Sequence, residues 1–140
     1  MFKAAVVLAL GFSLVLCACS RHETLTTDEL RSQLISARSL AAETEIFLDY
    51  VRQNRATKSY AQGHIKYLAE EIERSREELQ QSSPAQGEGD AVQQLRAQFN
   101  ALNAELHSIR GRLDDEVALA TAKEHIARIR EALYEANSPI

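Results

Sequence analysis

Four side chains between residues 60 and 71 form the densest group in this chain with the chemistry to bind or react: Tyr60, His64, Tyr67 and Glu71. Their spacing of four, three and four residues places them along one face of a helix. Metal sites in helical bundles draw on repeated Glu and Glu-x-x-His positions, and the sequence contains no Glu-x-x-His. We therefore favour packing at the edge of a core over a metal or acid–base site, and keep a ligand-binding face as the alternative.

The remaining candidate residues offer no further chemistry. His107 and His125 have no neighbouring Cys or His, so we expect ordinary surface or hydrogen-bonded positions. The sequence has no Gly-rich phosphate loop, no serine nucleophile motif, no Cys-x-x-Cys and no haem attachment motif. It therefore predicts a protein that is not an enzyme and that uses no cofactor and no metal.

The N-terminus has the layout of a secretory signal: Lys3, an apolar run from Ala4 to Leu16, then small residues. This run of 13 residues is shorter than the roughly 20 that a membrane-spanning helix needs. At its end, Leu16-Cys17-Ala18-Cys19 resembles the lipobox of bacterial lipoproteins, with an aliphatic residue, a small residue before the cleavage and a cysteine after it. The alternative is an ordinary signal peptide cut elsewhere.

The resemblance implies that residues 1–18 are removed and that the thiol of Cys19 receives a diacylglyceryl group, with acylation of the new amine. Two or more acyl chains, palmitate among the usual ones, anchor a protein stably. The partner implied first is therefore a membrane. Ser20 stands where an Asp would favour the inner membrane, so the family's sorting rule favours the outer membrane, with the domain facing the periplasm. Residues 19–26 would form the lipidated cysteine and a short tether.

Processing would leave no free thiol, because Cys17 departs with the signal and Cys19 carries lipid. It would also remove Lys3, leaving 15 of the 16 basic residues against 20 acidic ones and a formal charge of -5. This negative charge disfavours nucleic-acid binding. The remaining 122 of the 140 residues are enough for one domain.

Two helices are expected in the first part of the domain. Thr26 and Glu29 match a capping box, which predicts a helix over about 27–54; a second helix over about 59–81 follows a polar stretch, and a Ser/Pro/Gly loop ends it. Their apolar seams contain Leu30, Leu34, Ala37, Ala41, Thr44, Leu48 and Val51 in the first helix, and Ala61, Ile65, Leu68, Ile72 and Leu79 in the second.

Three apolar residues of the first helix, Ile35, Ile46 and Tyr50, point well away from its seam. A helix buried on more than one side of a bundle would explain them. A surface for a partner helix or protein is the second interpretation. We favour burial, and keep the surface as the sharper hypothesis.

The last helix is expected over about 90–136, followed by a tail at 137–140. Its seam is Val92, Leu95, Phe99, Leu102, Leu106, Ile109 and Leu113. From Leu119 to Leu133 the apolar residues point almost opposite to that seam, so the helix either meets different neighbours or breaks near Gly111. We favour one long helix, because Val117 and Ala120 still follow the first seam.

The pattern predicts an all-α fold in one helical domain over 27–136. Two arrangements fit: an antiparallel three-helix bundle with a turn near residues 55–59, which we favour, or a long coiled-coil helical hairpin in which 27–81 is one helix.

The sequence thus predicts a lipid-anchored helical protein of the cell envelope with a structural or interaction role. Its expected partners are the membrane and another envelope protein or a second copy. The alternative is a periplasmic binder of a small apolar or metal ligand, held between helices near Tyr60, His64 and Tyr67.

Overall fold

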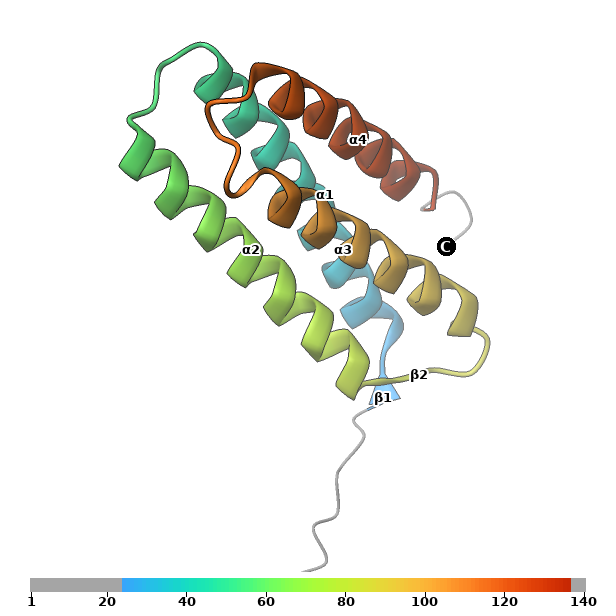
Figure 1. The fold of residues 1–140 in the computed structure, drawn as a ribbon. Helices are drawn as coiled ribbons and strands as arrows, with labels where there is room; N and C mark the ends of the chain where they lie inside the picture. The colour runs from blue at the N-terminus through green and yellow to red at the C-terminus, as the bar shows by residue number, and fades with distance from the viewer. Residues whose placement is uncertain (1–23, 137–140) are drawn as a thin grey trace, which may run out of the picture.

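A computed structural model describes residues 24–136 as a bundle of four helices that run alternately up and down (Figure 1). The helices are α1 (Thr27–Arg52), α2 (Lys58–Gln81), α3 (Gly89–Ile109) and α4 (Glu116–Glu135). Two short strands, β1 (Thr24–Leu25) and β2 (Ser83–Pro84), pair in parallel at one end of the bundle. The predicted all-helical class is confirmed. The lipobox, Cys19 and the tail at 137–140 lie outside the described residues.

The start of α1 follows the predicted capping box. The Thr26 hydroxyl accepts a hydrogen bond from the Glu29 backbone N–H at 3.3 Å, and a Glu29 carboxylate oxygen accepts one from the Thr26 N–H at 2.7 Å. These bonds satisfy N–H groups that have no partner within the helix. The Thr26 N–H is also the main reason why the pKa of the Glu29 carboxyl is lowered.

The alternative in which residues 27–81 form one helix is wrong. Helix α1 ends at Arg52, Asn54 takes a left-handed φ of 55°, and α2 begins at Lys58. Thr57 caps α2, its hydroxyl accepting a hydrogen bond from the Tyr60 N–H at 3.3 Å. Asparagine tolerates this backbone conformation better than most residues, so the polar stretch supplies a turn without Gly or Pro.

The predicted single helix over 90–136 is also wrong, and with it the three-helix bundle. The chain leaves α3 after Ile109 and starts α4 at Glu116, where the Asp115 carboxylate caps the helix by accepting from the Ala118 N–H at 2.9 Å. This bond, aided by Arg112, lowers the pKa of the Asp115 carboxyl. Val117, which follows the first seam in sequence, is 76% exposed.

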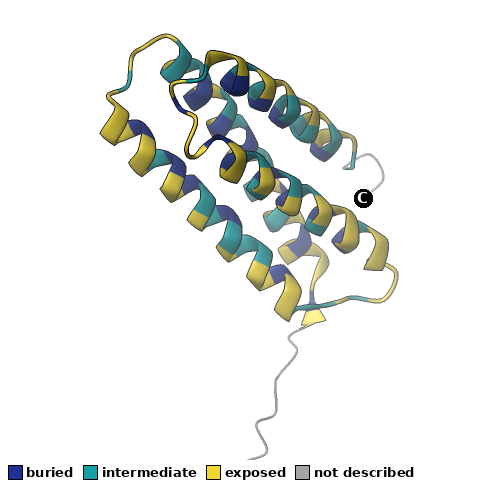
Figure 2. Cartoon of the chain, viewed as in Figure 1, coloured by how far each residue is buried: buried dark blue, intermediate teal, exposed yellow. Residues whose placement is uncertain are grey.

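The four helices bury their apolar faces in one core (Figure 2). All seven predicted seam residues of the segment 92–113 are buried, and Leu119, Ala122, Ile126 and Leu133 are buried on α4. Folding back at residues 110–115 explains this outcome, because it turns two oppositely directed seams toward the same interior. The predicted seams of the first two helices are buried as well, with Val51 partly so.

Two arginines bind the carboxyl ends of helices other than their own. Arg38 of α1 donates from Nε and Nη2 to the Leu133 carbonyl of α4, at 3.0 and 2.7 Å, and its guanidinium lies 4.6 Å from the ring centre of Tyr134. Arg96 of α3 donates to the carbonyls of Leu79 and Ser82, at the end of α2. The last carbonyls of a helix lack hydrogen-bond donors within it, so each arginine joins two neighbouring helices by donating to these carbonyls.

We expect Arg96→Leu to lower the free energy of unfolding by about 2 kcal/mol, because hydrogen bonds to charged groups contribute roughly 1.5–3 kcal/mol. The matched control is Arg74→Leu, which removes an arginine that is 64% exposed and paired only with Glu71 in its own helix; we expect a change within about 0.5 kcal/mol. Urea unfolding measures both. Equal losses in the two variants would contradict the role given to Arg96.

Candidate interaction surface between α1 and α2

One side of the bundle is less closed than the others. Helix α1 packs along α4, α2 packs along α3, and α3 packs against α4, whereas α1 and α2 touch each other much less. Polar contacts add to the pairing of α1 with α4: Arg130 lies 3.0 Å from Glu45, and Lys123 pairs with Asp49. Helix α1 therefore packs mainly against α4 and only lightly against α2.

A shallow hollow of about 570 Å³ lies on this side, lined by Ser39, Glu43, Ile46, Phe47, Tyr50, Tyr60 and His64. Ile46 is 70% exposed and Tyr60 is 54% exposed. Phe47, by contrast, is buried and joins the hollow to the core. We call the surface formed by Ile46, Phe47, Tyr50, Tyr60, His64 and Tyr67 the α1–α2 face.

Ring contacts hold this face in a defined shape. The imidazole of His64 lies 4.3 Å from the Phe47 ring centre and stacks on Tyr60 at 5.8 Å with an angle of 14° between the planes. Tyr67 extends the row, 5.7 Å from His64. Nε2 of His64 also lies 3.3 Å from a carboxylate oxygen of Glu43 on α1. Aromatic contacts of this kind stabilise beyond simple burial, so they favour this one arrangement of the rings.

The structure brings together two groups of residues that the sequence singled out separately. Ile46 and Tyr50 of α1 line the same hollow as Tyr60 and His64 of α2, and Tyr67 contacts His64. Ile35 does not line the hollow. Ile35, Ile46 and Tyr50 are all exposed, so their favoured burial within the bundle is wrong. Glu71 is half-buried and pairs with Arg74 at 3.0 Å. Ser39, Glu43 and Phe47 were missed as members of the site, because only the position of α2 beside α1 reveals them.

The α1–α2 face combines apolar and aromatic side chains with one acid–imidazole pair. Among residues 24–136, no three His, Cys, Asp or Glu side chains come together in a way that could hold a metal ion. Glu43 and His64 form a single acid–imidazole pair with ring neighbours on several sides. Within the same described range, no helix has both the length and the apolar character to cross a membrane.

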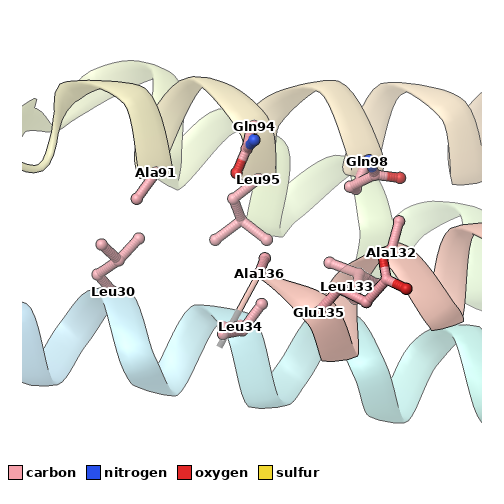
Figure 3. A pocket seen from close by; sticks show the side chains of 10 residues that line it. All are labelled: Leu30, Leu34, Ala91, Gln94, Leu95, Gln98, Ala132, Leu133, Glu135 and Ala136. Atoms are coloured by element: carbon pink, nitrogen blue, oxygen red, sulfur yellow. The ribbon is translucent and has the colours of Figure 1, made fainter. Parts of the chain in front are cut away.

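A second hollow, of about 440 Å³, lies near the end of α4, between α1, α3 and α4 (Figure 3). Its apolar lining comes from Leu30, Leu34, Ala91, Leu95, Ala132, Leu133 and Ala136, and its polar lining from Gln94, Gln98 and Glu135. Alanines at three of these positions leave space that larger side chains would fill. The sequence could not reveal this hollow, because it exists only when the chain folds back before α4.

The chain matches no protein-family model, no curated protein and no solved structure.

Proposed function

We propose that this protein is a lipid-anchored helical module of the bacterial cell envelope, and that its α1–α2 face binds another protein. The observation that carries the proposal is where large exposed apolar side chains gather. Among the described residues, five of the seven lie on α1 and α2: Ile35, Ile46, Tyr50, Tyr60 and Tyr67. Apolar side chains that cluster on one exposed side mark binding surfaces, whereas scattered ones carry no such meaning.

The residue types on this side suit a protein partner. Tyrosine is enriched among the residues that dominate binding energy at protein interfaces, because it offers a large contact area with a polar tip. Tyr60 and Tyr67 are already held by their contacts with His64, so less side-chain freedom is lost when a partner binds. A rim containing Ser39 and Glu43 surrounds the apolar centre, as in most protein interfaces.

The folded end of the tether supports the anchored arrangement. Leu25 is only 7% exposed, β1 pairs with β2, and the Thr27 hydroxyl donates to Glu88 at 2.6 Å. Part of the predicted tether over 19–26 therefore belongs to the fold. With Cys19 as the lipidated residue, five residues precede Thr24, a reach of about 17 Å when extended. This short tether would hold the β1–β2 end of the bundle close to a membrane.

The proposed location is the periplasmic side of the outer membrane, because Ser20 follows the cysteine. In this arrangement α1 and α2 rise from the membrane, and the α1–α2 face lies toward their far end, near the turn at residues 53–57. The proposal assigns no reaction to the chain. Its role would be to present a binding surface at a fixed distance from the lipid.

We expect Ile46→Asp and Tyr50→Asp to leave the fold intact and to abolish the co-purification of partners that the wild-type protein retains. Both side chains are exposed, so a carboxylate there costs little in folding but opposes an apolar contact. Circular dichroism and affinity purification measure the two effects. Val117→Asp is the matched control, since Val117 is also apolar and exposed but lies on α4. Unchanged partners in the α1 variants would rule out this surface.

A second candidate function is the binding of a small apolar ligand between helices. It was expected near Tyr60, His64 and Tyr67, but the hollow between α1, α3 and α4 is the more enclosed of the two and is lined by four leucines. We expect native mass spectrometry of the purified protein to show a bound apolar compound that is lost in Ala132→Leu, where the added side chain would fill the hollow. A mass equal to that of the bare protein would count against this candidate.

A further inference from the structure

We infer that the partner of the α1–α2 face is an amphipathic helix of another protein, with Lys or Arg residues on both sides of its apolar stripe. This inference rests on the proposed function and adds the chemistry of the partner. It follows from three features of the described residues: the spacing of apolar side chains along α1, the charge around the face, and the positions at which this chain's own ends leave the bundle.

The spacing of exposed side chains along α1 suits a helix as the partner of the α1–α2 face. Ile35, Ser39, Ile46 and Tyr50 are separated by four, seven and four residues, so they follow one stripe along the helix. Ile35 and Ile46 are 11 residues apart, about 16 Å along the axis. The hollow between α1 and α2 lies beside this stripe. An added helix of three or more turns could place its side chains on the stripe and in the hollow together.

The charge beside the α1–α2 face is negative. Glu43 lies at the hollow, and Glu78 of α2 faces α1, since it accepts a hydrogen bond from Gln33 at 2.9 Å. Glu71 is seven residues before Glu78 and seven after His64, which places it on the same face of α2.

The neighbouring cations do little to balance these carboxylates. Arg38 and Arg52 of α1 both turn toward α4, where they contact the Leu133 carbonyl and Glu116. Arg31 of α1 pairs with Asp28 in its own helix. On α2, Arg74 pairs with Glu71. Glu43, Glu71 and Glu78 therefore outnumber Arg74 beside the α1–α2 face. Basic residues that flank the apolar stripe of a partner helix would complement this negative charge.

A second copy would bring like charges to this face, and the described residues begin and end elsewhere on the bundle. A second copy that used the same face would bring its Glu43, Glu71 and Glu78 against the same three residues, and like charges across an interface are unfavourable. The four residues after Ala136 follow a residue that lines the hollow between α1, α3 and α4, on the other flank of α1. In the processed chain, five residues precede Thr24. Thr24 pairs with Ser83, which follows the end of α2, whereas Tyr60 lies near the start of that helix.

A displayed library of 21-residue helical peptides tests the inference. Each peptide has fixed leucines at heptad positions and random Lys, Glu, Gln or Ala at the flanking positions, and selection uses the full mature protein in phosphatidylcholine nanodiscs. We expect enrichment of Lys at the flanks, and binding that Ile46→Asp reduces at least tenfold. We also expect the combined variant Glu43→Lys, Glu71→Lys and Glu78→Lys to select Glu at the flanks instead.

The matched control combines Glu124→Lys, Glu131→Lys and Glu135→Lys, three exposed positions on α4 with the same change in total charge. It should keep the wild-type selection, and an effect equal to that of the α1–α2 variant would show that only net charge matters. Selection without a charge preference, but sensitive to Ile46→Asp, would overturn the basic partner and leave the proposed function standing. Failure to select any peptide, or a dimer in sedimentation that Ile46→Asp abolishes, would overturn the inference.

Discussion

The segments 92–113 and 119–133 carry apolar seams that would point in nearly opposite directions on one continuous helix. Both can be buried in a single core only if the chain turns back between them, and the loop from residue 110 to 115, closed by the Asp115 cap, makes this reversal. Helix α4 then lies against α1. Because α4 and α3 both supply partners for α1, the contact between α1 and α2 stays limited, and the aromatic residues of that side remain accessible.

Much of this architecture follows from local sequence signals. The capping box of Thr26 and Glu29 and the buried seams of α1 to α3 follow from residue spacing alone. The break before α4 was missed because Val117 and Ala120 continue the first seam in sequence, yet Val117 faces solvent once α4 has turned. The arginine contacts of Arg38 and Arg96 with distant carbonyls have no local signature, since they depend on which helices become neighbours.

The candidate surface was predictable in its parts and not as a whole. Ile46 and Tyr50 stand out because they lie away from the seam of α1, and Tyr60, His64 and Tyr67 stand out by their spacing on α2. Their meeting across one hollow requires the turn at residues 53–57 and the position of α4, which no single helix encodes. The resulting surface combines a row of ring contacts with a negative margin, the two features on which the proposed partner depends.

The proposed position of this surface near a membrane depends on lipidation of Cys19. Intact mass spectrometry of protein extracted from membranes, beside a Cys19→Ala variant, tests it most directly. We predict a chain that begins at Cys19 and carries acyl groups in the wild type, with no lipid in the variant. A wild-type chain without lipid would contradict the account and leave a secreted helical domain with no fixed distance from the membrane.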